Sequence, residues 1–209
     1  MRISTIKKGL FGAVLATAAM TMAAFTSAPT VGSKAPDFEL KDLNGNAHTL
    51  SGILAKDDTK AVVLEWYNPE CPYVVVHYSE ENQTMNKVAE KYASEGVVWL
   101  RINSGAEGKQ GAGLQKNKDF AKKYMIDGPI LLDESGKVGK AYNAKRTPEM
   151  FIIGKDNKIH YHGSMESARS TREVGEDIYV EQAIQQILRG ETVTVKGKDP
   201  RGCSVKYAN

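Results

Sequence analysis

The sequence of 209 residues has little net charge, only two cysteines and no long hydrophobic run. The formal charge is +3, and Arg2, Lys7 and Lys8 account for it, because the first 28 residues contain no acidic residue. The rest of the chain is neutral on balance, so its charge predicts neither nucleic acid nor an anionic membrane as a partner. No Gly-Lys-Ser/Thr sequence follows a strand-like segment, which excludes a P-loop.

The N-terminus has the pattern of a secretory signal peptide. A basic start is followed by a short apolar run at 9–20 and by mostly small residues through Ala28. The run is too short for a membrane-spanning helix. We therefore expect a signal peptide at 1–28, one domain at 29–190 and a tail at 191–209, with the mature protein in the periplasm and without a membrane anchor.

The two cysteines are Cys71 and Cys203. In an oxidising compartment they could form a disulfide or both stay free, and their spacing does not decide between these states. Cys71 lies where a strand-like run at 61–64 gives way to a helical pattern that begins at Pro72. Unpaired N–H groups at the start of a helix favour a thiolate, which is the nucleophilic form of cysteine. The alternative is a buried structural cysteine.

The hydrophobic pattern along the chain predicts an α/β protein. A hairpin is expected at 37–50, around Asn44-Gly45. Strands are expected at 60–67, 97–102, 129–133, 150–153 and 159–163, and helices at 72–95, 114–125, 138–142 and 178–188. The helix at 72–95 is expected to bend near 79–83, and 104–113 is expected to be a surface loop. This order predicts a mixed central sheet with helices on both faces, and places Cys71 at the carboxyl end of a strand.

Four motifs stand out along the chain. They are Lys34-Ala35-Pro36-Asp37-Phe38, Cys71-Pro72-Tyr73-Val74 followed by His77, the segment 142–149 with Thr147-Pro148-Glu149, and the segment 202–207 around Cys203. These motifs resemble those of redoxins, the peroxiredoxin-like (alkyl hydroperoxide reductase/thiol-specific antioxidant) group with the thioredoxin-like fold. The resemblance covers roughly residues 32–207. It implies a thiol oxidoreductase in which Pro148 forms a cis peptide bond and packs against the active cysteine.

Two positions depart from the patterns of these proteins. Val74 stands where thioredoxins have their second cysteine, so the resolving thiol of the motif is absent. Leu64 and Asn68 stand where peroxiredoxins have a proline and a Thr or Ser. The Asn68 amide could donate a hydrogen bond to a peroxide in place of the missing hydroxyl.

The chemistry expected of Cys71 is attack on a disulfide, which gives a mixed disulfide, or on a peroxide, which gives a sulfenic acid. Cys203 or an external thiol reductant must then resolve the product. The leading hypothesis is therefore a secreted thiol oxidoreductase with antioxidant or thiol-disulfide exchange activity. The rival is a non-catalytic binding module with a structural Cys71–Cys203 disulfide. The electron donor and the oligomeric state stay open.

Other candidate residues have weaker patterns. His77 is expected to be a surface or packing residue rather than a base. Glu65 is either a buried carboxylate for proton transfer or a residue that faces water. Glu70 would disfavour the Cys71 thiolate if it lay close. His160 and His162 share a strand face, but two histidines do not make a zinc site. No metal or other cofactor is predicted.

Overall fold

The computed structural model describes residues 28–168 and 170–209. The predicted signal peptide, apart from Ala28, lies outside the described residues. None of the helices in the described part is long and apolar enough to cross a membrane.

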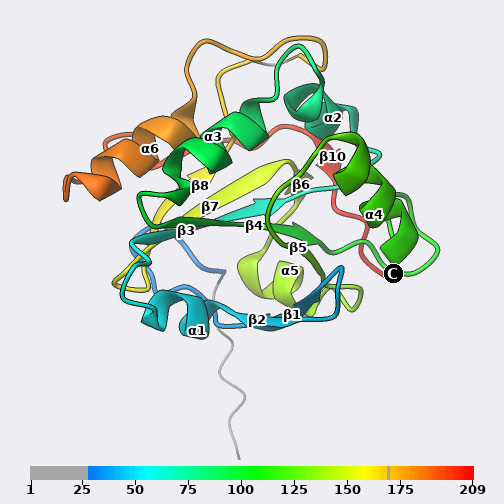
Figure 1. The fold of residues 1–209 in the computed structure, drawn as a ribbon, viewed down its shortest axis with the longest axis horizontal. Coiled ribbons are helices and arrows are strands. Elements are labelled where there is room, and N and C mark those ends of the chain that lie inside the picture. Colours follow the sequence, from blue (N-terminus) through cyan, green and yellow to red (C-terminus); the bar gives the residue numbers. More distant parts are fainter. Residues whose placement is uncertain (1–27, 169) are drawn as a thin grey trace, which may run out of the picture.

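Ten strands and six helices follow one another along the described chain (Figure 1). The N-terminal half contains β1 (Glu39–Asp42), β2 (Ala47–Thr49), α1 (Leu50–Ala55), β3 (Ala61–Trp66), α2 (Pro72–Tyr78), α3 (Thr84–Ala93) and β4 (Val97–Asn103). The C-terminal half contains α4 (Leu114–Lys123), β5 (Ile130–Leu132), α5 (Lys137–Tyr142), β6 (Arg146–Thr147), β7 (Glu149–Gly154), β8 (Ile159–Gly163), α6 (Tyr179–Leu188), β9 (Gly197–Lys198) and β10 (Cys203–Ser204).

The central sheet is mixed, as expected, and has eight strands in the order β2-β1-β5-β4-β3-β7-β8-β9. In its middle, β3 pairs with β4 in parallel and with β7 antiparallel. All six residues of β3 are buried, which explains its nearly continuous apolar sequence. A separate sheet consists only of β6 and β10. The arrangement is a thioredoxin-like α/β fold, so the predicted fold class is confirmed.

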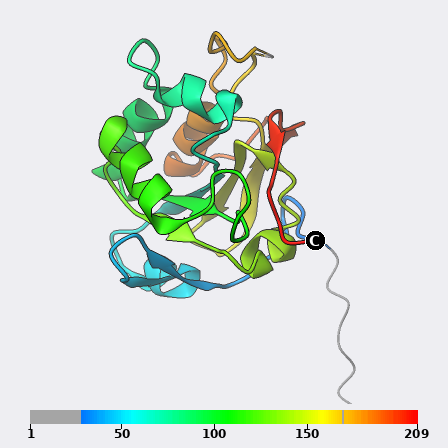
Figure 2. The same cartoon turned by 90° about the vertical axis from the view of Figure 1, so that its right-hand side faces the viewer.

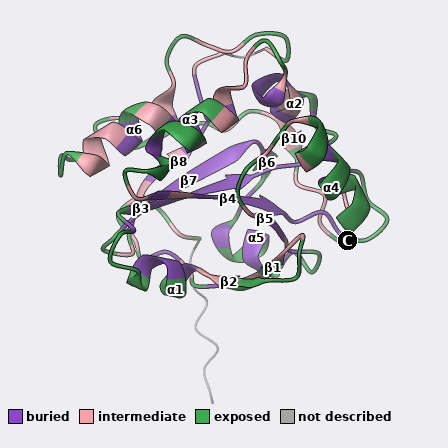
Figure 3. Cartoon of the chain, viewed as in Figure 1, coloured by how far each residue is buried: buried purple, intermediate pink, exposed green. Residues whose placement is uncertain are grey.

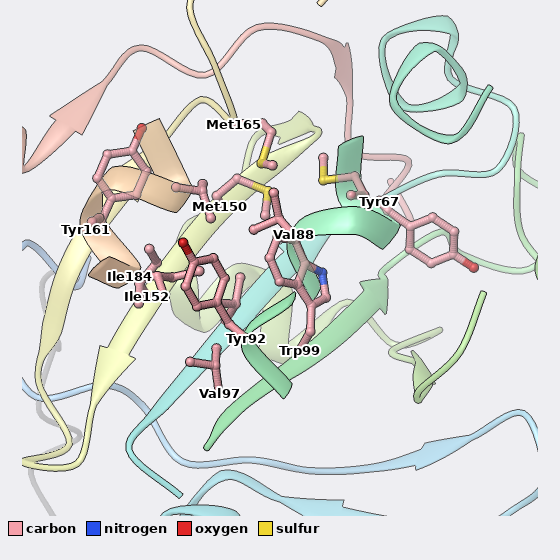
Figure 4. Close-up of a cluster of buried hydrophobic side chains, with 14 of the residues drawn as sticks. Tyr67, Val88, Tyr92, Val97, Trp99, Met150, Ile152, Tyr161, Met165 and Ile184 are labelled. Atoms are coloured by element: carbon pink, nitrogen blue, oxygen red, sulfur yellow. The ribbon is translucent and has the colours of Figure 1, made fainter. Parts of the chain in front are cut away.

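Two hydrophobic layers cover the two faces of the sheet, and buried strands separate them (Figure 3). Trp99 of β4 lies in the layer under α2, α3, α4 and α6, where it packs among the residues of Figure 4. Trp66 of β3 lies in the opposite layer, under α1 and α5. Because side chains alternate along a strand, each central strand contributes to both layers.

The predicted helix at 72–95 is two helices, and the expected bend is a full interruption. The side chains of Ser79 and Asn82 both donate to the carbonyl of Val76 at 2.9 Å, which satisfies a free carbonyl at the end of α2. Gln83, just before α3, has a φ of 48°, which no helix residue adopts. The chain therefore changes direction between α2 and α3.

The tail, for which no secondary structure was expected, contains β9 and β10. In parallel with β8, β9 extends the central sheet, and β10 pairs antiparallel with β6. Figure 2 shows the red tail beside the yellow-green segment that contains β6. The tail therefore pairs with strands of the preceding domain at two places.

Candidate functional site

Cys71 lies between β3 and α2, at the position the sequence predicts. It is the N-cap residue of α2, and its carbonyl accepts hydrogen bonds from the N–H groups of Val74 and Val75, both at 2.9 Å. Pro72 is the first helical residue, where its lack of an N–H costs no hydrogen bond. The Cys71 side chain is fully buried. Local sequence therefore fixes where this thiol lies, and burial limits what can reach it.

The predicted cis peptide bond joins Thr147 to Pro148. It lies at the corner between β6 and β7, directly beside Cys71. The Sγ of Cys71 donates to the Thr147 carbonyl oxygen, with 3.0 Å between the two atoms. Two segments 76 residues apart in the chain thus meet at the thiol.

Cys203 lies at the same place, opposite Thr147 in the β6–β10 pair. It packs against the hydrophobic layer that contains Cys71, and both cysteines are free thiols. Burial, together with a hydrogen bond to the Cys71 side chain, raises the pKa of the Cys203 thiol to about 11. The structure therefore brings the two thiols together, although the linear sequence separates them widely.

Gly202 explains how the tail approaches so closely. A Cβ atom at this position would overlap with the carbonyl group of Thr147, the same carbonyl that accepts the Cys71 hydrogen bond. Its φ is 151°. Only glycine allows the two backbones to lie this near to each other. Gly202 belongs to the motif at 202–207, but the linear sequence does not indicate this close approach to Thr147.

Glu149 holds the corner that presents Thr147. Its Oε2 accepts hydrogen bonds from the N–H groups of Lys145 and Arg146, both at 2.7 Å. Its Oε1 lies 2.7 Å from Nε2 of His162. The carboxylate is 2% exposed, so these contacts replace its water shell. The Thr-Pro-Glu motif was the only sequence signal for this role.

Asn68 and Glu70 face the loop at 104–113 and are held by it. The Asn68 amide donates to the Gln110 carbonyl at 3.3 Å, and its oxygen accepts from the Glu70 N–H at 2.8 Å. The Glu70 carboxylate binds the Gly111 N–H and the Lys116 ammonium, both at 2.7 Å. The Lys116 hydrogen bond lowers the pKa of Glu70. The loop is therefore a wall of the site, and both residues serve to anchor it.

Glu65 is fully buried, so the alternative in which it faces water is wrong. Its carboxylate accepts from the Tyr78 hydroxyl and from the Trp99 indole N–H, each at 2.8 Å. The Nε of Arg101 lies 3.7 Å away and donates to the Tyr78 hydroxyl at 2.8 Å. Burial raises the pKa of Glu65, and the nearby guanidinium opposes that rise. These four side chains form one polar network inside the layer that contains Cys71.

His77 is buried rather than exposed, and it lines a small hollow beside Pro148. Its Nε2 lies 3.7 Å from Oε1 of Glu166, and its Nδ1 has no hydrogen-bond partner among the described residues. Burial lowers the pKa of His77 to about 4 and raises that of Glu166. The imidazole is therefore neutral at pH 7.

His160 and His162, which share a strand face, have separate acidic partners. Nε2 of His160 lies 2.9 Å from Asp156, and Nε2 of His162 contacts Glu149. Within residues 28–168 and 170–209, no group of three or more His, Cys, Asp or Glu side chains could hold a metal ion.

Comparisons with known proteins agree with this fold. The AhpC/TSA family matches residues 31–162. The thiol-disulfide oxidoreductase ResA of Geobacillus kaustophilus is 32% identical over 133 residues, which are 64% of this chain and 68% of that protein.

Two solved structures resemble almost the whole described chain. A hypothetical protein of Sinorhizobium meliloti 1021 has a TM-score of 0.76 and 29% identity, with 87% of this chain and 97% of that chain covered. An uncharacterized conserved protein of Geobacillus kaustophilus also has a TM-score of 0.76 and 29% identity, with coverages of 85% and 92%. With the thiol, the cis-proline and the mixed sheet in these positions, the chain belongs to the AhpC/TSA family and has the thioredoxin-like fold.

Proposed function

We propose that the protein is a thiol-disulfide oxidoreductase in which Cys71 is the nucleophile and Cys203 is the resolving thiol. The observation that carries this proposal is the convergence of both cysteines on Thr147. Cys71 donates to its carbonyl, and Cys203 lies opposite it in the β6–β10 pair. The name of the similar thiol-disulfide oxidoreductase ResA supports the same class of reaction.

The proposed reaction has two exchange steps. The Cys71 thiolate attacks one sulfur of a substrate disulfide, forms a mixed disulfide and releases the other sulfur as a thiolate. The Cys203 thiolate then attacks the Cys71 sulfur and releases the second substrate thiolate. The substrate is reduced to two thiols, the protein dithiol is oxidised to a disulfide, and an external dithiol regenerates it.

The surroundings of Cys203 support this order of events. Its pKa of about 11 keeps it protonated at neutral pH, so it is a poor first nucleophile. Part of that rise comes from the Cys71 thiol, and this contribution is lost when Cys71 enters a mixed disulfide. Formation of the first intermediate therefore favours ionisation of the second thiol.

Disulfides suit the site better than peroxides. Asn68, whose amide could donate a hydrogen bond to a peroxide, instead donates to the Gln110 carbonyl and accepts from the Glu70 N–H. Leu64 stands where peroxiredoxins have a proline. It is buried in the layer on the opposite face of the sheet from Cys71.

Turnover measured with a protein disulfide and with hydrogen peroxide tests this function. Cys71→Ser is expected to abolish disulfide reduction, and Cys203→Ser is expected to stop at a mixed disulfide that mass spectrometry detects as an adduct. Ser94→Ala, at an exposed position at the end of α3, is the control and should turn over like the wild type. Equal rates in all four proteins would exclude catalysis by Cys71.

The same experiment separates the enzyme from the binding module. In the module, Cys71 and Cys203 form a permanent disulfide, so the purified protein has a mass lower by two hydrogen atoms and no turnover. An enzyme instead interconverts between the dithiol and the disulfide when substrate or reductant is added.

We also propose that residues 1–28 are removed as a signal peptide and that exchange takes place in the periplasm. The basic start and the short apolar run of this segment support secretion. N-terminal sequencing of the protein from a periplasmic extract should give a start between residues 24 and 29. An intact Met1 in a cytoplasmic fraction would contradict the proposal.

A further inference from the structure

We propose that residues 201–207 are a displaceable strap that covers Cys71, and that an extended polypeptide carrying a disulfide takes its place on β6. This inference rests on the proposed exchange at Cys71 and adds how access to that thiol is controlled. The strap is defined as residues 201–207 and includes β10.

The first observation is that the nucleophile cannot be reached while the strap is in place. Cys71 is fully buried, and thiol-disulfide exchange requires a sulfur of the substrate to approach its Sγ directly. The groups next to that thiol include Cys203, which packs against the hydrophobic layer that contains Cys71, and Gly202, which lies against the Thr147 carbonyl. Both belong to the strap.

The second observation is that few backbone hydrogen bonds hold the strap. Its strand has two residues, and its partner β6 also has two, which makes a marginal sheet by itself. Outside this pair, the Val205 N–H donates to the Lys145 carbonyl at 3.1 Å and the Ala106 N–H donates to the Lys206 carbonyl at 2.8 Å. Segments with few buried contacts open at low free-energy cost.

A third contact anchors the far end of the strap. The Tyr207 hydroxyl donates to the Ala144 carbonyl at 2.8 Å, and its ring packs over Gly136 and Gly139 at α5. The ammonium of Lys140 lies 5.7 Å from the ring centroid. This anchor is separate from the thiols, so it offers a way to loosen the strap without changing either cysteine or Thr147.

The kind of ligand follows from the strand edge that is exposed when the strap is displaced. Removal of β10 exposes the backbone of Arg146 and Thr147, which is a strand edge directly beside Cys71. Extended peptides bind such edges by adding a strand, with backbone hydrogen bonds giving affinity. A peptide in the place of β10 would put its own cysteine where Cys203 now lies. The tail thus occupies the site as an internal competitor of a polypeptide substrate.

Alkylation of Cys71 by iodoacetamide tests the strap directly. In a Cys203→Ala background, Cys71 is the only thiol, so each alkylation event reports its exposure. Gly202→Ala places a methyl group against the Thr147 carbonyl, which forces the strap away from β6. The alkylation rate of Cys71 should therefore rise by roughly tenfold or more. Gly190→Ala is the matched control, since that glycine also has a positive φ, of 70°, but has nothing within 4 Å of the added methyl group.

Tyr207→Ala provides a second variant if Gly202→Ala fails to fold. It removes the anchor at α5 and should also accelerate alkylation. Equal rates in the background protein and in the strap variants would overturn the proposal. A disulfide turnover assay on the wild type is run in parallel. If the strap variants alkylate faster but no protein reduces a disulfide, the exchange function is wrong and the strap stands.

Hydrogen exchange tests the replacement of the strap by substrate. A cysteine-containing peptide is trapped as a mixed disulfide on Cys71 in the Cys203→Ala protein. The amides of Val205 and Ala106, which bond across the strap, should then exchange faster, whereas the Tyr67 amide, bonded to Ile102 between central strands, should not change. Unchanged protection at Val205 and Ala106 would show that the peptide does not displace the strap.

Discussion

Single titratable side chains in the interior have very different environments. Glu65 and Arg101 are almost completely buried, and hydrogen bonds to Tyr78 and Trp99 compensate for the loss of water. His77 has no such compensation, because its Nδ1 lacks a partner among the described residues and Glu166 is 3.7 Å from its Nε2. The neutral form is therefore the stable form of His77, and charging it destabilises the fold.

This difference predicts how stability depends on pH. Burial lowers the pKa of His77 from 6.5 to about 4, so between these values the unfolded chain binds a proton that the folded protein does not. The stability that the neutral imidazole contributes is complete above pH 6.5 and is lost as the pH falls toward 4. From pH 7 to pH 4.5 the wild type should lose about 2–3 kcal/mol more than His77→Gln, as measured by urea unfolding.

Glu166 contributes with the opposite sign. Burial raises its pKa, so its contribution to stability is present at low pH and is lost as the pH rises. The wild type and His77→Gln both retain Glu166. The difference between their free energies of unfolding therefore contains little of the Glu166 contribution. Parallel stability curves for the wild type and His77→Gln would contradict the prediction.

At the scale of elements, the corner between β6 and β7 is the part that positions the site. Its cis peptide bond presents the Thr147 carbonyl to Cys71 on one side and to Gly202 on the other. On the β6 side, the corner pairs only with the two-residue strand β10. Glu149 adds support by accepting two backbone N–H groups ahead of the turn.

Glu149→Gln is therefore expected to destabilise the protein by about 2–3 kcal/mol. One carboxylate oxygen accepts two backbone hydrogen bonds and the other lies against His162, whereas an amide in the same place would present a donor to one of these groups. The midpoint of urea unfolding measures the effect. Glu134→Gln, at an exposed position just after β5, should change stability by less than about 0.5 kcal/mol. A loss equally small at Glu149 would refute its role.

Elements with a long hydrophobic pattern were predictable from the sequence, and short ones were not. The runs at 61–64 and 150–153 are apolar because β3 and β7 are buried on both faces. The two-residue strands β9 and β10 have no pattern to detect, since alternation needs several residues. The contact between Cys71 and Cys203 depends on tertiary structure, so sequence motifs could nominate both thiols but could not bring them together.

At the scale of the whole molecule, the tail contacts several separate elements around the site. After α6 it adds β9 to the edge of the central sheet, crosses the cis-proline corner as β10 and ends against α5 and the loop at 104–113. A bond between Cys71 and Cys203 would therefore close a loop that includes most of the domain. Oxidation is expected to affect global stability as well as the site.

The oxidised protein should be more stable to unfolding than the reduced protein by up to about 4–5 kcal/mol, because a long closed loop restricts the unfolded chain. Urea unfolding with and without a dithiol reductant measures this difference, provided that mass spectrometry establishes the redox state. Cys203→Ser should give the same curve under both conditions. A wild type with no dependence on reductant would mean that the two thiols do not form a bond.

The positions of the two tryptophans make the protein a spectroscopic reporter of its own layers. Trp66 and Trp99 lie on opposite faces of one sheet, and each indole N–H has a different acceptor, Ser104 for Trp66 and Glu65 for Trp99. In Trp66→Phe, all tryptophan emission comes from the layer that contains Cys71, and in Trp99→Phe it comes from the other layer. Fluorescence can therefore record movement in the layer around the thiol separately from movement in the layer on the opposite face of the sheet, without any added dye.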